Sequence, residues 1–321
     1  MSEDAVNKIL VISGPTASGK SELALRLAHA LDAEIVNADS MQVYRGLDIG
    51  TAKPSHEQLA DVRHHLIDVT DPDQPFSAAD FSDAADAAIR DIISRGKRVI
   101  VAGGTGLYIR ALLKGLVESP SGAGKIRQAL QDEASRVGND VMLERLRRVD
   151  PVLAATLHPN NLVRIIRALE VYQLTGIPLS RYQKEHAFAV KRYDALQIGI
   201  SVERGLLYER IDDRVERMLE AGLLDEVRTQ LGAGFGRELK SMCSIGYKEV
   251  VAHLCGELSA QEAVSLIKRN TRHYAKRQLT WFKADPDILW FEYPEKFATI
   301  LKHAIDFFEL REVQRNVQST V

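Results

Sequence analysis

Short apolar runs alternate with amphipathic stretches along most of the chain. Six runs have the length of β-strands and are rich in Val, Ile and Leu: residues 9–13, 34–37, 65–69, 98–102, 196–201 and 288–292. Most of the stretches between them repeat their apolar residues at helical spacing. Such alternation is typical of a parallel sheet covered by helices. The pattern therefore predicts an α/β fold.

One long gap interrupts the strand pattern, between residues 102 and 196. Helical spacing recurs within it over residues 126–137, 141–149 and 162–174, and the last of these stops at Gly176. A stretch rich in Ser, Gly and Pro at residues 119–124 has the composition of a hinge. We therefore expect a core domain formed by residues 1–118 and 196–314, an inserted all-helical domain formed by residues 119–195, and a loose tail at residues 315–321.

Composition argues against a membrane protein and against a secreted one. The 321 residues have a formal net charge of −2 and are 45% hydrophobic, and they contain no apolar run of about 18 residues, which argues against a membrane span. Cys243 and Cys255 are the only cysteines, as expected in a reducing compartment, and the acidic, polar start is unlike a targeting signal. We expect a cytoplasmic protein with no membrane partner, in which any site for a polyanion is local.

Residues 14–21 read GPTASGKS and follow the first apolar run directly. The spacing G-x-x-x-x-G-K-[ST] is that of a phosphate-binding loop, in which backbone N–H groups and a helix N-terminus point at an anion. Lys20 would reach the terminal phosphate, and the Ser21 hydroxyl would bind Mg²⁺. The sequence thus predicts a P-loop NTPase-like sheet in which phosphate groups are bound by Gly14, Pro15, Thr16, Ala17, Ser18, Gly19, Lys20 and Ser21.

The usual partners of a P-loop in nucleotide hydrolases do not occur in the sequence. GTPases read their base with N-K-x-D after a later strand, but the only Asn-Lys pair, Asn7-Lys8, precedes the first strand. Common ATPases place an acidic residue at the end of an apolar strand to hold Mg²⁺. Here the fourth run ends in Gly103-Gly-Thr-Gly106, a neutral turn that offers hydrogen bonds instead.

Asp39 is the acidic candidate, because it follows the second apolar run. The carboxyl ends of strands in such a sheet converge on the ligand crevice, so Asp39 and Thr105 should face the P-loop. A carboxylate there could hold Mg²⁺ or act as a base. Alternatively, Asp39 only caps the next helix.

Cationic residues gather near the C-terminus at helical spacing. No acidic residue lies between Glu262 and Asp285. About half of the helix surface there is formed by Lys268, Arg269, Arg272, His273, Lys276 and Arg277, opposite Ile267, Tyr274 and Trp281. Charged faces are most often only solvated, but the lack of acids and the aromatic pair that follows favour RNA.

A second set of arginines lies at residues 204–217, interleaved with acidic residues. Most of these would pair along a helix. Arg210 and Arg214 are four residues apart and are the candidates for closing over a phosphate.

Several motifs occur together in one order. They are GPTASGKS at 14–21, DSMQVY at 39–44, HHLID at 64–68, GGTGLY at 103–108, RIIRALE at 164–170, IGYKE at 245–249 and KRQLTW at 276–281. This set closely resembles the bacterial tRNA dimethylallyltransferases over nearly the whole chain. The resemblance implies transfer of a dimethylallyl group from its diphosphate to N6 of adenosine 37, beside the anticodon, in tRNAs that read codons beginning with U. It also implies that the P-loop holds an isoprenoid diphosphate rather than ATP.

The same resemblance assigns roles to individual residues. Asp39 would be the general base, Thr105 would orient the target base or bridge to the diphosphate, and Lys20 with Mg²⁺ on Ser21 would stabilise the leaving diphosphate. The helical insertion and the basic helix would embrace the anticodon stem-loop. The matching positions are Asp39, Ser40, Met41, Gln42, Thr105, Arg127, Val163, Arg164, Ile165, Ile166, Arg167, Cys243, Ser244, Ile245, Gly246, Tyr247, Lys248, Lys276, Arg277, Gln278, Leu279, Thr280, Trp281, Phe282 and Lys283.

Three other interpretations compete with this one. A small-molecule or nucleotide kinase could use the same P-loop fold with ATP, although the basic helix would then have no purpose. A relative that prenylates free adenine nucleotides would lack the parts that embrace RNA. An RNA-binding regulator would have no need of Lys20, Ser21 and Asp39 together. A monomer is the default expectation, because a single stem-loop needs no two-fold partner.

Overall fold

The computed structural model describes residues 7–116, 124–186 and 192–309. The chain divides into two compact units, one formed by residues 1–113 and 192–321 and the other by residues 114–191. The smaller unit thus begins and ends a few residues before the 119–195 expected from the sequence. The return to the larger unit comes early because the Arg192 N–H donates to the carbonyl of Leu113 and Asp194 already pairs with Lys8 of the first strand. The predicted tail, and the predicted hinge apart from Gly124, lie outside the described residues.

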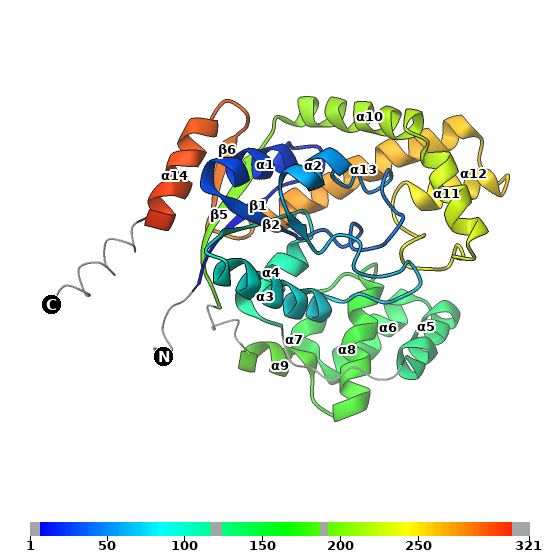
Figure 1. Ribbon diagram of the computed structural model, residues 1–321. Coiled ribbons are helices and arrows are strands. Elements are labelled where there is room, and N and C mark those ends of the chain that lie inside the picture. Colours follow the sequence, from blue (N-terminus) through cyan, green and yellow to red (C-terminus); the bar gives the residue numbers. More distant parts are fainter. Residues whose placement is uncertain (1–6, 117–123, 187–191, 310–321) are drawn as a thin grey trace. The chain divides into compact units, whose positions relative to one another are not determined.

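Within the described residues, six strands form one parallel sheet in the larger unit (Figure 1). They are β1 (Lys8–Ser13), β2 (Ala33–Asn37), β3 (His64–His65), β4 (Arg98–Gly103), β5 (Asp194–Ser201) and β6 (Ile288–Glu292). Their order is β3-β2-β4-β1-β5-β6, so β1 lies between β4 and β5. The predicted α/β fold with a parallel sheet is confirmed.

Alternate side chains of β1 enter two different hydrophobic layers. Ile9 and Val11 pack with α3 (Ala78–Ser94) and α4 (Gly106–Lys114) on one face of the sheet. Leu10 and Ile12 pack with α1 (Lys20–Leu31) and α14 (Phe297–Glu309) on the other. A strand buried on both faces reads as a continuous apolar run, as this one does.

The third predicted strand was wrong over most of its length. Residues 65–69 were expected to be extended, but β3 contains only His64 and His65. Leu66 and Asp68 have positive φ values of 64° and 57°, which end the strand. The N–H groups of Asp68 and Val69 then donate to carbonyls of residues 42 and 43. The chain therefore folds back onto the segment that follows β2.

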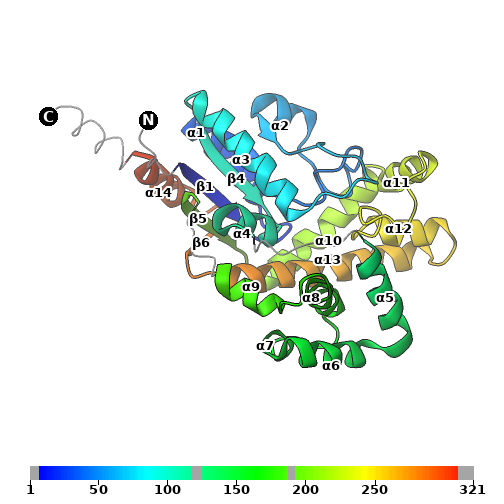
Figure 2. The same ribbon diagram turned by 90° about the horizontal axis from the view of Figure 1, so that it is seen from below.

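Four further helices of the larger unit form a separate hydrophobic cluster beside the two sheet layers. They are α10 (Arg204–Glu220), α11 (Leu223–Gly232), α12 (Tyr247–Leu254) and α13 (Ala260–Lys283), whereas α2 (His56–Asp61) stays outside this cluster. Val43, Tyr44 and Leu47, from the segment after β2, are buried in this cluster. Figures 1 and 2 show α13 as a long helix beside α10. It begins at a capping box formed by Ser259 and Glu262.

The smaller unit consists of helices in its described part. They are α5 (Lys125–Val137), α6 (Asn139–Val149), α7 (Pro151–Ala154), α8 (Leu162–Thr175) and α9 (Leu179–His186). The core contains Leu130, Met142, Leu146, Ile165 and Leu169. Gly176 ends α8 in the left-handed conformation, as predicted. The short helices α7 and α9 were not predicted. Neither these helices nor those of the described larger unit are long and apolar enough to cross a membrane.

Candidate active site

The P-loop forms the turn from β1 to α1. Gly19 has a φ of +94° immediately before the first helical residue, a conformation that favours glycine. Its position leaves the N–H groups at the start of α1 directed into the turn, where they can bind an anion. Ser18 is fully buried, and its Oγ has no hydrogen-bond partner among the described groups. The Ser18 N–H donates to the carbonyl of Pro15 at 3.3 Å within the loop.

The neutral turn after β4 lies against the end of β2. A Cβ on Gly103 would lie 2.1 Å from the carbonyl oxygen of Ala38, so a side chain at this position would clash with backbone. Thr105 donates its N–H to the same oxygen at 3.1 Å. Its Oγ1 accepts a hydrogen bond from the N–H of Ser40 at 2.9 Å. Thr105 thus holds the segment that carries Asp39.

Asp39 begins a turn rather than a helix. Its Oδ1 accepts a hydrogen bond from the N–H of Met41 at 2.8 Å, and residues 40–43 form turns. The alternative expectation that Asp39 caps the next helix is therefore wrong, because the next helix begins only at His56.

A small cavity of about 70 Å³ joins the predicted catalytic groups, and Lys20, Ser21, Asp39 and Arg214 line it together. Burial, and then the neighbouring Arg214, lower the pKa of Lys20 to about 8, against an opposing effect of Asp39. Burial also lowers the pKa of Arg214. The cavity thus concentrates cationic groups beside one carboxylate.

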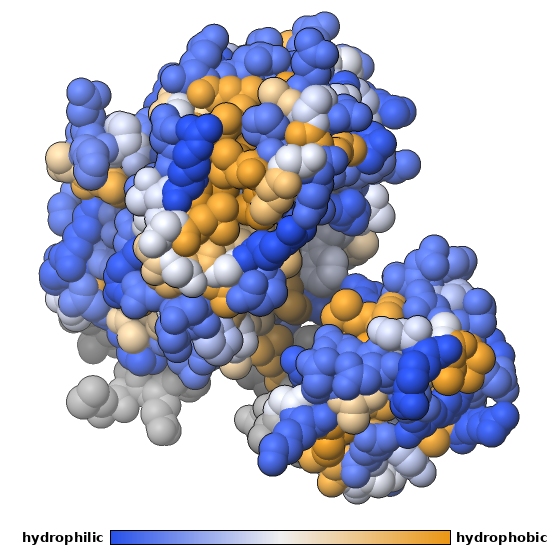
Figure 3. Space-filling view, turned by 90° about the vertical axis from the view of Figure 1, so that its right-hand side faces the viewer, coloured by the Kyte–Doolittle hydropathy of each residue, from blue (hydrophilic) through white to orange (hydrophobic). Residues whose placement is uncertain are grey.

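A larger cavity of about 300 Å³ shares Asp39 and Arg214 with the first and has apolar walls. Its lining includes Val215, Met218 and Ile267 from α10 and α13, together with Ser40, Met41 and residues 243–247. Figure 3, which views the right-hand side of Figure 1, shows apolar side chains gathered within a hydrophilic border on the larger unit. Burial, and then the charge of Asp39, raise the pKa of Tyr274, which also lines this cavity. Tyr274 therefore remains a protonated hydrogen-bond donor.

A third cavity of about 310 Å³ also borders the P-loop. Gly19, Lys20 and Ser21 line it together with Arg210, Arg214 and Arg217 of α10. The structure thus brings both predicted arginines to the phosphate-binding loop. Arg217 was not predicted, although its spacing of three residues from Arg214 places it on the same helix face.

The basic helix predicted from the sequence is α13, but part of its charge is paired. Lys268 forms an ion pair with Glu216 of α10, and Arg272 lies 3.4 Å from Asp212 of α10. The prediction that the whole stripe faces water or a polyanion is therefore corrected. The cationic side chains that stay exposed lie on one face, at Arg269, His273, Lys276, Arg277 and Lys283.

Several residues predicted to contact tRNA have buried side chains. Tyr247 donates its hydroxyl hydrogen to Glu226 from within the α10–α13 cluster, and Phe282 packs in the sheet core. Gln278 is also buried and bonds to backbone groups. Tyr247 and Gln278 nevertheless line the two cavities that contain Asp39, whereas Phe282 lines neither of them. Gln42 uses its amide to bond the carbonyls of Thr51 and Ala52.

The predicted tRNA-contacting residues of the smaller unit divide in the same way. Ile165 and Ile166 are buried in its core, which corrects the expectation for their side chains, whereas Val163 is 83% exposed. Arg127 and Arg167 each place a guanidinium 2.7 Å from Oε2 of Glu170. The Glu170 carboxylate is fully buried. Burial is the largest single effect on its pKa and raises it, but the hydrogen bonds and charges of the two arginines together outweigh burial, so the pKa of Glu170 is lowered. Arg127 is thus held at the surface of its own unit.

Comparisons with known proteins agree with this geometry. The family model described as IPP transferase matches residues 42–285. The chain belongs to the IPP transferase family. A tRNA dimethylallyltransferase of Pelobacter propionicus is 70% identical over 96% of this chain and 100% of its own length. One of Geobacter metallireducens is 57% identical over 96% of this chain and its own full length (100%).

Solved structures of the family are also similar. The tRNA isopentenylpyrophosphate transferase of Bacillus halodurans is 38% identical, with a TM-score of 0.72 over 97% of this chain and 99% of its own. A eukaryotic dimethylallyltransferase, described as acting on tRNA, is 31% identical with a TM-score of 0.77 over 94% of this chain and 80% of its own. The likeness therefore extends over both units of the chain.

Proposed function

We propose that this member of the family transfers a dimethylallyl group from dimethylallyl diphosphate to N6 of adenosine 37 in tRNA. The observation that carries the proposal is the shared lining of the two cavities. Asp39 and Arg214 line both the cavity at Lys20 and Ser21 and the apolar cavity beside it. A diphosphate, a short hydrocarbon and a proton-accepting carboxylate can thus meet at one place.

The reaction needs an acid–base group and a site for a leaving anion. The N6 amine forms a bond to C1 of the dimethylallyl group as the bond from C1 to the diphosphate oxygen breaks. Asp39 takes the proton that N6 releases. Lys20, Arg210 and Arg214 stabilise the charge that develops on the diphosphate, together with the N–H groups of the P-loop. Arg217 lines the same cavity and adds to this positive field.

A magnesium ion fits the donors that the cavity offers. Mg²⁺ is usually held by one or two protein oxygens, by waters and by substrate phosphates. The Ser21 hydroxyl lines the cavity beside Lys20, where an ion bound to diphosphate oxygens would meet it. Mg²⁺ would neutralise charge on the leaving diphosphate.

RNA binding is assigned to the exposed face of α13 and to the surface of the smaller unit. Arg269, Lys276 and Arg277 offer cations for phosphates of an anticodon stem-loop. Adenosine 37 would have to leave its stack to reach Asp39. We expect a cytoplasmic monomer acting on tRNAs that read U-initial codons. A small-molecule or nucleotide kinase is not favoured, because relatives matched over the whole chain carry names of tRNA prenyl transfer.

One assay tests the proposal. The protein is mixed with Mg²⁺, labelled dimethylallyl diphosphate and an anticodon stem-loop carrying A36, A37 and A38, and the RNA is digested to nucleosides. We expect label in N6-modified adenosine at position 37 and none in a stem-loop with G37. Transfer of phosphate from ATP to a small acceptor, with no label in RNA, would overturn it.

A further inference from the structure

We infer that Glu226 is a positioning residue for the transfer reaction, acting through the loop at residues 48–52. The inference rests on the proposed function. Glu226 lies on α11 and lines none of the three cavities described above. Its effect must therefore pass through the residues that it holds.

The Glu226 carboxylate accepts three consecutive backbone N–H groups. Oε2 accepts from Asp48 at 2.8 Å and from Ile49 at 2.7 Å, and Oε1 accepts from Gly50 at 3.1 Å. Hydrogen bonds to an ionised carboxylate are about twice as strong as neutral ones. One side chain from α11 thus determines the path of three residues that are far from it in the sequence.

Tyr247 completes this anchor from α12. Its hydroxyl donates to Oε1 of Glu226 at 2.5 Å. Burial, and then the charge of Glu226, raise the pKa of Tyr247, so that the hydroxyl remains a donor. The tyrosine ring also packs on Gly50, where an added Cβ would lie 2.4 Å from Cε2 of Tyr247. The buried tyrosine of the IGYKE motif therefore orders the loop rather than RNA.

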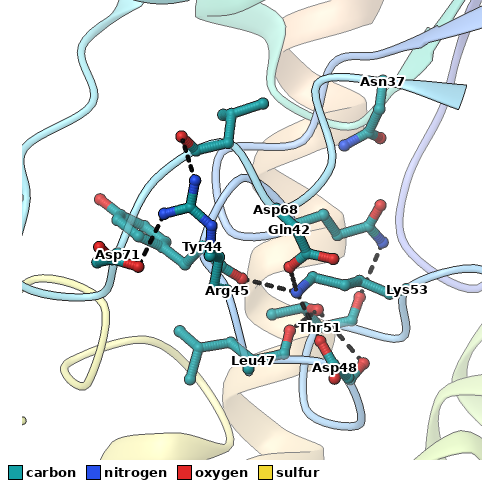
Figure 4. A network of polar contacts seen from close by, with 12 residues as sticks. Asn37, Gln42, Tyr44, Arg45, Leu47, Asp48, Thr51, Lys53, Asp68 and Asp71 are labelled. Atoms are coloured by element: carbon teal, nitrogen blue, oxygen red, sulfur yellow. Dashed lines mark hydrogen bonds and ion pairs between the residues drawn. The ribbon is translucent and has the colours of Figure 1, made fainter.

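The carbonyl groups at the end of the loop accept hydrogen bonds from residues that line the site (Figure 4). Nε2 of Gln42 donates to the carbonyls of Thr51 and Ala52, each at 3.0 Å. Arg214 lies 3.5 Å from the same Thr51 carbonyl. Thr51, Gln42 and Asp39 line one cavity. The loop thus links the Glu226 anchor to the turn that carries the proposed base.

A separate anchor holds the end of the same segment. The ammonium of Lys53 lies between the carboxylates of Asp48 and Asp68 and donates to the carbonyl of Tyr44 (Figure 4). These contacts do not involve Glu226. Loss of Glu226 should therefore leave the N–H groups of residues 48–50 without their acceptor, while Lys53 still holds the Asp48 side chain and the end of the segment.

The expected consequence is a loss of turnover rather than of donor affinity. A shift of about 1 Å in a reacting group can lower a rate about 10²-fold. In Glu226→Ala, we expect kcat to fall about 10-fold or more because the turn bearing Asp39 loses support. The P-loop contacts are untouched, so KM for dimethylallyl diphosphate should stay within about three-fold.

The test combines kinetics with amide hydrogen exchange on four variants of the full chain. These are Glu226→Ala, Glu226→Gln, Tyr247→Phe and the matched control Asp225→Asn, whose carboxylate lies on the same helix and pairs with exposed Arg228. We expect kcat to be highest in the control and progressively lower in Tyr247→Phe, Glu226→Gln and Glu226→Ala. Exchange at residues 48–50 should rise in the same order. Melting temperatures report whether each variant is folded.

Two results would overturn the inference: a kcat for Glu226→Ala equal to that of the control, or unchanged exchange at residues 48–50. If Glu226→Ala does not fold, Glu226→Gln and Tyr247→Phe decide the question by the same criteria. Hydrogen exchange reports on the loop whether or not the protein transfers dimethylallyl groups. A wild-type protein that fails to label RNA would overturn the proposed function, while the exchange data would still test the anchor.

Discussion

The side-chain oxygen of Gln278 accepts a hydrogen bond from the backbone N–H of Thr16 at 2.8 Å. The other end of the same amide donates to the carbonyl of Gly104 at 2.9 Å. A Cβ on Gly104 would lie 2.3 Å from Nε2 of Gln278, so glycine is needed for this contact. One residue of α13 therefore joins the P-loop to the neutral turn after β4.

We expect Gln278→Leu to weaken donor binding without weakening RNA binding. Leucine leaves the Thr16 N–H and the Gly104 carbonyl without these partners, and the loss at the buried Gly104 carbonyl costs about 1–3 kcal/mol. KM for dimethylallyl diphosphate should rise about 10-fold as the P-loop loses its support. Gln278→Glu retains the acceptor for Thr16, but it places a carboxylate oxygen against the Gly104 carbonyl and a negative charge in the cavity of Lys20, so its KM should rise at least as much. Loss of RNA affinity at constant KM would instead assign Gln278 to RNA contact.

Asp39 can be tested as a base separately from its role in the turn. Asp39→Asn keeps an oxygen for the Met41 N–H but cannot take a proton, so turnover should fall about 10²-fold or more while RNA affinity is retained. Asp39→Ala also removes the turn contact and should be no more active. Single-turnover labelling and stem-loop binding measure the two effects. Equal losses in both assays for Asp39→Asn would contradict the role of a base.

The exposed face of α13 should contribute to the salt dependence of RNA binding, whereas the paired side should not. Each phosphate contact contributes about 0.7–0.9 to the slope of log K against log salt. Lys276→Ala with Arg277→Ala should therefore lower the slope by roughly 1.5. Lys268→Ala with Arg272→Ala is the control, because these two cations are paired with α10. Identical slopes for both double variants would show that the exposed face is only solvated.

Donor binding should weaken as pH rises through about 8. Burial lowers the pKa of Lys20 to about 8, so the ammonium is charged below this pH and becomes neutral above it. The diphosphate binds best to the charged form, and phosphate groups with a last pKa of about 6 do not titrate in this range. Calorimetry with dimethylallyl diphosphate from pH 7 to pH 10 should show falling affinity. Lys20→Ala should bind weakly at every pH, and a pH dependence that persists in it would assign the effect to another group.

The location of the site could be predicted from the sequence because it depends on local rules. A P-loop marks a strand-to-helix turn, and the ends of parallel strands meet at one edge of the sheet. These two rules correctly placed Lys20, Ser21 and Asp39 around one cavity. Thr105 was expected to face the P-loop together with Asp39, but it lines none of the three cavities and instead contacts Ser40, next to Asp39.

Contacts between distant segments could not be predicted in this way. The acidic partners of Lys268 and Arg272 lie 52 and 60 residues earlier, so helical periodicity alone left both cations unpaired. Glu226 and Ile49 are 177 residues apart, and no local pattern connects them. The shortness of β3 has the same origin, because Asp68 and Val69 bond to the carbonyls of residues 42 and 43 instead of extending the sheet.

The position of β1 between β4 and β5 has a consequence for how the chain folds as it is synthesised. β1 is the first strand to leave the ribosome, but its second neighbour begins only at Asp194, after the whole helical unit. The helices of residues 125–186 make their core from nearby segments and can fold as soon as they emerge. We therefore expect the smaller unit to fold before the sheet is complete, while β1 keeps one open edge that is exposed to aggregation until β5 arrives.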